Sequence, residues 1–189
     1  MKVMFYTDEE RKILLEAKAI IKANKRSYLR DIIKDETGFD IIPMTEELKS
    51  FLESKCQEFI QHFNQNQNLI THSRYGLLVE NKFREFCKFN RPKGSGYPDC
   101  EIPEDVFTLS PFVENKTYSI DSIKSPLRTF YYNSFNKINR TTYHVLVGFE
   151  FGENQTGKYL TGNYHIVDLY DKKMTFRMEI NAGNSEIYG

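Results

Sequence analysis

The hydrophobic periodicity of the chain changes at one loop, the glycine- and proline-rich stretch RPKGSGYPD at residues 91–99. Before this loop, apolar residues recur at the three- and four-residue spacing of amphipathic helices. After it they come in strand-length runs, of which YHVLVGFEF at 143–151 is nearly continuous. The change of period predicts an α/β fold, with a central mixed β-sheet flanked by helices and a helical N-terminal part.

Three helices are expected before the loop. Thr7-Asp8-Glu9-Glu10 has the pattern of a capping box, in which a hydroxyl and a carboxylate satisfy free backbone N–H groups, and it predicts a helix that ends near Gly38. A second helix is expected from Thr45 and a third from Gly76. The second would carry an apolar stripe made of Leu48, Phe51, Leu52, Cys56, Phe59 and Phe63.

Strands dominate the prediction after the loop. Residues 106–118 and 143–151 are expected to be strands, and residues 122–137 to hold a further helix. Residues 163–170 and 174–180 would form a closing hairpin. His144 lies within the apolar run at 143–151, so we expect it to be a hydrogen-bonded residue of the core.

Composition places the chain among globular proteins. It has 189 residues, of which 40% are hydrophobic, and no apolar run approaches the length of a membrane span. The N-terminus turns acidic at once and has no signal-peptide pattern, so we expect a cytoplasmic protein without membrane contact. Cys56, Cys87 and Cys100 form no CxxC pair, which argues against a disulfide framework or a zinc site.

The tripeptide Glu-Asn-Lys occurs twice, and secondary structure decides which copy can form a site. In the predicted helix, Glu80 and Lys82 would point to nearly opposite sides, because residues two apart diverge on a helix. In the predicted strand, Glu114 and Lys116 would share one face, roughly 7 Å apart. Only the second copy can therefore direct its acid and its base into one cleft.

A second carboxylate is available from Asp99, which follows a proline at the end of the glycine-rich loop. If its segment lies beside the strand of Glu114, the two carboxylates can bind one Mg²⁺, which prefers hard oxygen ligands. Lys116 could then position a water and offset charge on a transition state, which is the chemistry of phosphodiester hydrolysis. The alternative is a surface salt bridge at a strand end. Fallback carboxylates are Glu101, Glu104 and Asp105.

The series Asp99, Glu114, Asn115, Lys116 resembles the PD-(D/E)xK signature of a nuclease superfamily that includes many restriction enzymes. The middle residue of this signature is usually apolar, so Asn115 departs from it and would need hydrogen-bond partners if buried. The spacing between Asp99 and Glu114 is also longer than the family pattern.

Further segments are similar to the family of the MutH mismatch-repair nicking endonuclease and the related restriction enzymes that recognise GATC. Residues 116–122 and 125–130 resemble the segment that follows the catalytic strand in that family. Residues 76–80 resemble its helix with an active-site glutamate, and residues 137–150 its basic segment before a core strand. The likeness covers residues 74 to 152, and residues 1 to about 65 are not accounted for by it.

The resemblance implies a Mg²⁺-dependent type II restriction endonuclease that cuts double-stranded DNA. It implies that Asp99 and Glu114 bind the metal, with Glu80 assisting them. Lys116 would orient the water, and Lys137 would contact the scissile phosphate or the water. Cutting both strands of a palindrome needs two sites, so a homodimer is expected. The recognition sequence is left open, with GATC only a hint.

Contacts with DNA are expected from the segment after the catalytic strand. It is rich in basic and amide side chains, which bind phosphates and base edges. The candidates are Lys124, Arg128, Tyr131, Asn133, Asn136 and Arg140. A solvated helix with core tyrosines is the alternative reading of this segment.

Two other functions remain open at this point. The chain could be a monomeric nickase of DNA repair, or a non-catalytic DNA-binding protein that retains the fold. We expect residues 1–70 to be a helical N-terminal region and residues 71–189 to be the nuclease core, together forming one compact unit. No sharp change of composition marks the boundary between them.

Overall fold

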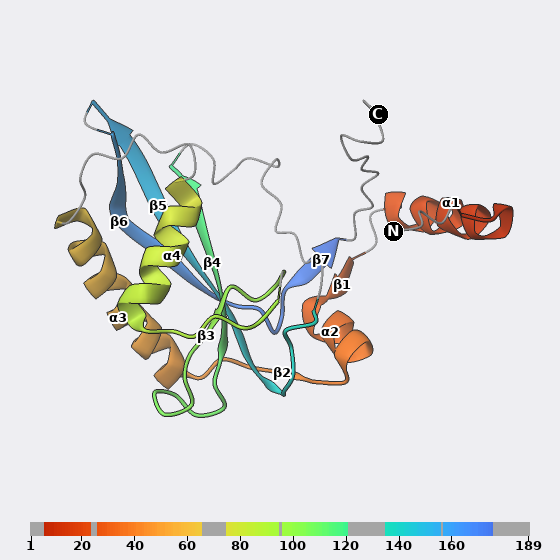
Figure 1. Ribbon diagram of the computed structural model, residues 1–189, viewed down its shortest axis with the longest axis horizontal. Helices are drawn as coiled ribbons and strands as arrows, with labels where there is room; N and C mark the ends of the chain where they lie inside the picture. Colours follow the sequence, from red (N-terminus) through yellow and green to blue (C-terminus); the bar gives the residue numbers. More distant parts are fainter. Residues whose placement is uncertain are drawn as a thin grey trace. The chain divides into compact units, whose positions relative to one another are not determined.

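The computed structural model divides the chain into two compact units, which are described separately here (Figure 1). The smaller unit combines Met1–Tyr28 with Lys173–Gly189, and the larger one is Leu29–Lys172. The expected division near residue 70 stays a prediction. The structure describes residues 6–23, 26–65, 75–94, 96–120, 135–155 and 157–175.

The smaller unit contains helix α1 (Asp8–Lys22) and two short strands, β1 (Arg26–Tyr28) and β7 (Lys173–Thr175). The predicted capping box is confirmed, since the Thr7 amide donates to Glu10 Oε2 at 2.7 Å and the Glu10 amide donates to Thr7 Oγ1 at 3.2 Å. The prediction of one helix as far as Gly38 is wrong, because β1 interrupts it.

Strand pairing explains both errors of the prediction in this region. β1 and β7 form an antiparallel pair, so the backbone of residues 26–28 is committed to a strand far away in the sequence. The expected closing hairpin is wrong for the same reason, because β7 pairs with β1 and not with its sequence neighbour. Local periodicity carries no information on which distant strand will be the partner. Residues 176–180 lie outside the described part of the chain.

The larger unit is built on a mixed sheet. It begins with α2 (Leu29–Thr37) and β2 (Ile41–Ile42), and the remaining strands are β3 (Cys100–Glu101), β4 (Phe112–Ser119), β5 (Thr142–Asn154) and β6 (Gly157–Asp168). The order is β2-β5-β4-β3, and β6 also pairs with β5. β4 and β5 run parallel, whereas β3 and β6 pair antiparallel with their neighbours. The predicted strand from Val106 therefore starts only at Phe112.

Helices α3 (Glu46–Gln65) and α4 (Tyr75–Cys87) cover one face of this sheet, as Figure 1 shows. The predicted stripe of α3 is confirmed, and it packs with α4 and the sheet into one hydrophobic cluster. Aromatic rings form the centre of that cluster, where Phe59, Phe83 and Phe149 pack against one another with centroids about 5 Å apart. The α/β fold with a central mixed sheet and flanking helices is thus confirmed.

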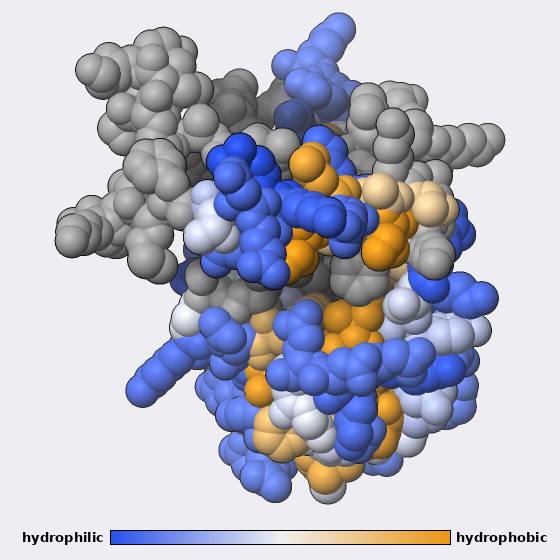
Figure 2. Space-filling view, turned by 90° about the vertical axis from the view of Figure 1, so that its right-hand side faces the viewer, coloured by the Kyte–Doolittle hydropathy of each residue, from blue (hydrophilic) through white to orange (hydrophobic). Residues whose placement is uncertain are grey.

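The surface of the described residues is mainly hydrophilic on the face drawn in Figure 2, where hydrophobic residues show as separate patches. Helix α1 contributes exposed apolar side chains, with Ile13, Leu15 and Ile20 each more than half exposed. No helix in the described ranges is both long enough and apolar enough to cross a membrane.

His144 is a buried, hydrogen-bonded core residue, as predicted. It is fully buried on β5, its Nδ1 lies 2.7 Å from the hydroxyl of Tyr97, and its ring stacks on that tyrosine and meets the edge of Phe112. Its Nε2 atom has no hydrogen-bond partner among the described residues. Burial, aided by the charge of Arg140, lowers the pKa of His144 to about 3.

A glycine lets α4 approach β4 closely. A Cβ atom at Gly76 would lie 2.8 Å from Oγ1 of Thr117, which is closer than real Cβ contacts. Glu80 follows Gly76 by four residues, so the two lie on the same side of α4. The close approach at Gly76 therefore determines how near Glu80 can lie to the strand.

We expect the buried imidazole of His144 to make stability depend on pH. Its pKa is about 3 in the folded chain and 6.5 in the unfolded chain, so below pH 6.5 only the unfolded chain takes up the proton. The free energy of unfolding should fall towards pH 3 by up to about 1.4 kcal/mol per pH unit. Urea unfolding of the wild type and of His144→Gln at several pH values checks this. Parallel curves of the free energy of unfolding against pH would contradict it.

The contact between Gly76 and Thr117 predicts a coupling in a double-mutant cycle. Gly→Ala in an open helix stabilises by up to about 1 kcal/mol, but Gly76→Ala should lower the free energy of unfolding because its methyl group meets Oγ1. In a Thr117→Ala background the same change should be neutral or stabilising, which gives a coupling on the order of 1 kcal/mol. Thr117→Ser keeps a side-chain oxygen and should not restore the stability that Gly76→Ala removes. If the changes in the free energy of unfolding of Gly76→Ala and Thr117→Ala simply add, the clash is ruled out.

Candidate active site

Asp99, Glu114 and Lys116 come together at β4. Nζ of Lys116 lies 2.6 Å from Oε1 of Glu114 and 3.1 Å from Oδ2 of Asp99. The same ammonium donates to the backbone oxygen of Asn115 at 2.8 Å. An ammonium has three N–H donors, so these three contacts satisfy it fully. One cation thus joins the two acids that the sequence placed at the centre of the site.

The free edge of β4 explains why Asp99 lies there. The described part of β3 pairs with β4 only at Phe112 and Val113. Two residues further along β4, the amide of Asn115 donates to Oδ2 of Asp99 at 3.0 Å. The carboxylate takes the acceptor position that a neighbouring strand would otherwise supply.

Burial shapes the electrostatics of this group. Glu114 is only 5% exposed, and its Oε2 atom has no hydrogen-bond partner among the described residues. Burial raises the pKa of Glu114 to about 7, against the opposing effect of the Lys116 charge. Burial also lowers the pKa of Lys116, but the charges of Glu114 and Asp99 outweigh it and the net direction is upward. Lys116 therefore stays charged.

Asn115 points to the opposite face of β4 and is 1% exposed. Its Nδ2 donates to Sγ of Cys100 at 3.3 Å. Its Oδ1 has no partner within the described residues. The side-chain amide of Asn115 therefore has one weak hydrogen bond, from its Nδ2 group to sulfur, and none at its oxygen within the described residues.

The two Glu-Asn-Lys copies behave as their secondary structures predict. On α4, Lys82 is exposed and forms an ion pair with Glu85 at 2.9 Å. Glu80 lies on another side of the helix and lines a pocket with Asp99. Burial raises the pKa of Glu80 to about 7, while the charge of Lys116 acts in the opposite direction.

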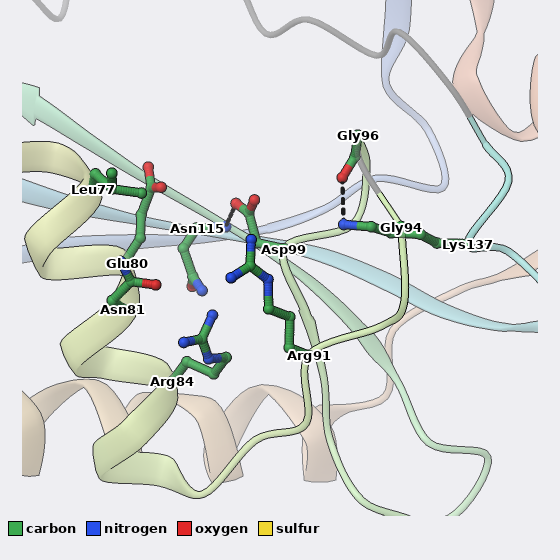
Figure 3. A pocket seen from close by; sticks show the side chains of 10 residues that line it. All are labelled: Leu77, Glu80, Asn81, Arg84, Arg91, Gly94, Gly96, Asp99, Asn115 and Lys137. Carbon is green, nitrogen blue, oxygen red and sulfur yellow. Dashed lines mark hydrogen bonds between the residues drawn. The ribbon is translucent and has the colours of Figure 1, made fainter.

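That pocket has a volume of about 260 Å³ and is lined by α4, the glycine-rich loop and β4. Figure 3 shows side chains of both signs around it, with Asp99 and Asn115 at the back. Three of its lining side chains are cationic, namely Arg84, Arg91 and Lys137. Its carboxylates are those of Asp99 and Glu80, whereas Glu114 and Lys116 are not among its lining residues. Its three cations suit an anionic substrate.

Lys137 reaches the same pocket but is held by backbone. It is 8% exposed, and its Nζ donates to the carbonyl oxygens of Gly96 at 2.6 Å and Pro98 at 2.7 Å. Burial lowers the pKa of Lys137, and the charge of Asp99 opposes that effect. One N–H donor remains in addition to the two carbonyl contacts. Lys137 therefore anchors the loop that carries Asp99.

The predicted DNA contacts are only partly described. Arg140 donates to Oε2 of Glu101 at 2.7 Å and to the backbone oxygen of Ser110 at 2.8 Å, and its guanidinium lies 4.2 Å from the centroid of Phe112. These contacts hold it within the protein. Asn136 is exposed. The other candidates lie outside the described residues: Lys124, Arg128, Tyr131 and Asn133.

Arg84 lines the pocket and was missed by the sequence analysis. It follows Glu80 by four residues on α4, so both lie on one side of the helix. That spacing from a candidate site residue is the signal that could have found it. Arg91 belongs to the glycine-rich loop, from which the sequence indicates that Arg91 and Lys93 could reach a phosphate.

The donor set fits Mg²⁺. No group of three or more His, Cys, Asp or Glu residues is gathered closely enough to hold a metal ion in the part of the chain that the structure describes. Mg²⁺ commonly takes only one or two protein carboxylates and fills its other positions with water and substrate phosphate. Asp99 and Glu114, with the unpartnered Oε2 of Glu114, meet that requirement.

Comparison with known proteins adds an independent result. A search of curated proteins found no match. The model of a family described as the Type II restriction enzyme MjaV family matches residues 19–189, which include every residue of the site described above. Because this match covers nearly the whole chain, the protein belongs to the type II restriction enzyme MjaV family.

Proposed function

We propose that this restriction endonuclease hydrolyses phosphodiester bonds at a short specific sequence of double-stranded DNA, with Mg²⁺ as cofactor and a site of the PD-(D/E)xK type. The observation that carries the proposal is the contact of the Lys116 ammonium with both Asp99 and Glu114. Two carboxylates and a lysine at the edge of one strand are the groups that metal-assisted hydrolysis requires. The family match supports the class of reaction.

Asp99 and Glu114 would hold the metal ion through their carboxylate oxygens. When bound, Mg²⁺ would offset phosphate charge and make a water a better nucleophile. Its charge would also favour the ionised form of Glu114, whose pKa burial raises. The buried Oε2 of Glu114 would then gain the partner that it lacks among the described residues.

Lys116 would orient the attacking water and offset the negative charge that develops on the phosphate. Its place is fixed by two hydrogen bonds and an ion pair, so it would need little reorganisation during the reaction. Glu80 would assist from α4 through a water. Lys137 would contact the scissile phosphate or the water with its remaining donor, while its two carbonyl contacts hold the Asp99 loop.

The DNA would run past the edge of β4, and the segment from Lys124 to Arg140 would follow its backbone. Since a palindromic site has two equivalent strands, a homodimer would place one active site on each. The resemblance to the MutH family favours GATC as the first sequence to test. A nickase of repair and a non-catalytic DNA-binding protein are the competing functions, and the digestion below separates all three.

We expect Mg²⁺-dependent cleavage of supercoiled plasmid by the wild type and loss of cleavage in Glu114→Gln. The variant keeps the shape of the side chain and removes the charge, so it should lower the rate on the order of a hundredfold or more. The readout is a gel of digested plasmid with Mg²⁺ and with EDTA. Discrete fragments support a restriction enzyme, and sequencing their ends gives the recognition site.

The control is Glu153→Gln, which removes a carboxylate from an exposed position near the end of β5 and should cleave like the wild type. Nicked circles in place of fragments would favour the nickase. A gel shift without cleavage would favour the binding protein. Equal cleavage by wild type and Glu114→Gln would overturn the site assignment.

Glu80 and Glu85 give a matched pair on one helix. Glu80→Gln should raise the Mg²⁺ concentration for half-maximal cleavage about 10- to 100-fold, the usual effect of removing a supporting group near a metal. Glu85→Gln should not, because Glu85 is exposed and paired with Lys82. Magnesium titrations of the cleavage rate measure both. Identical magnesium titrations for the two variants would show that Glu80 does not support the binding of the metal.

A further inference from the structure

Two arginines face the pocket without a partner among the residues that the structure describes. Arg84 comes from α4 and Arg91 from the loop that follows, and both line the pocket beside Asp99. Figure 3 shows their guanidinium groups directed toward the same region, whereas the carboxylate of Glu80 points away from them. Neither arginine forms an ion pair or a hydrogen bond with any residue in the described ranges.

The other two arginines that the structure describes in this unit are paired. Arg30 forms ion pairs with Asp31 and Asp171 and lies over the ring of Tyr170. Arg140 is bound by Glu101 and by the backbone. The contrast distinguishes the pocket, because two like charges directed toward one region repel each other and a bound anion between them would relieve that repulsion.

The chemistry of the guanidinium group indicates which anion would fit. Its planar set of N–H donors matches the two free oxygens of a phosphodiester, and a pair of guanidiniums can bind one phosphate from two sides. Arg84 also lies four residues, about 6 Å along the helix axis, beyond Glu80. The place for the anion is thus next to the carboxylate site and separate from it.

We propose that Arg84 and Arg91 bind a backbone phosphate of the DNA strand adjacent to the phosphate that is cut. This inference rests on the proposed function, because it takes DNA as the ligand and the group around Lys116 as the place of cleavage. The pair would help to hold the strand beside Asp99 and Glu114. It would supply affinity without reading a base, since phosphate contacts position the protein and carry no direct sequence information.

The test is the salt dependence of DNA binding, measured with a short fluorescent duplex in Ca²⁺ so that the DNA stays intact. Because both arginines bind one phosphate, the double variant should reduce the slope of log affinity against log salt concentration by about 0.9, and Arg84→Gln and Arg91→Gln should each reduce it by part of that. Lys82→Gln removes one positive charge from the same helix but faces away from the pocket, so it should keep the wild-type slope.

Cleavage kinetics provide a second readout. With Mg²⁺, both arginine variants should raise KM for plasmid several-fold and leave kcat within about twofold at saturating DNA, the pattern expected when binding energy is lost uniformly. Arg91 is exposed on a loop, so its variant tests the idea even if Arg84→Gln is destabilised. Wild-type salt slopes in both variants would overturn the phosphate site.

The two proposals can fail separately. If the wild type cuts DNA with Mg²⁺ but the arginine variants keep its salt slope, the phosphate site is wrong and the nuclease assignment stands. If the wild type binds the duplex without cutting it and the arginine variants lose slope, the phosphate site stands and the catalytic assignment fails. Lys82→Gln must stay at the wild-type slope in either case, and a loss there would overturn the assignment to the pocket.

Discussion

The hydrogen bond from the amide of Asn115 to the carboxylate of Asp99 is the contact on which the arrangement of the site depends. It forms two residues after Val113, the last residue of β4 that pairs with β3 in the described part of the chain. An edge amide must find an acceptor, and here that acceptor is also an acid. The requirement of the backbone thus brings Asp99 beside Glu114 and Lys116, which alternate along the same strand.

Charge balance within the group follows from that placement. Glu114 is almost fully buried, and its ionised form is tolerable only because Lys116 is adjacent to it. Lys116 is satisfied by two acids and a carbonyl, while one oxygen of Glu114 lacks a partner in the described chain. The group therefore has capacity for one more cation, which agrees with the magnesium proposed for it.

The sequence predicted what depends on local periodicity and failed where distant pairing decides. The stripe of α3, the buried His144 and the shared face of Glu114 and Lys116 follow from spacing of two or of three and four residues, and the structure has all of them. The long first helix and the closing hairpin failed because β1 pairs with β7. Arg84 was missed because its role is visible only once α4 lies against β4.

Lys137 joins the glycine-rich loop to the segment that precedes β5. Its ammonium holds the carbonyls of Gly96 and Pro98, so the backbone that presents Asp99 is fixed by a residue 39 positions beyond Pro98. The loop and the segment containing Lys137 therefore behave as one module. A chimera that takes the loop from one family member and the lysine segment from another could lose the hydrogen bonds between the ammonium and the two carbonyl oxygens. The two segments should therefore be exchanged together.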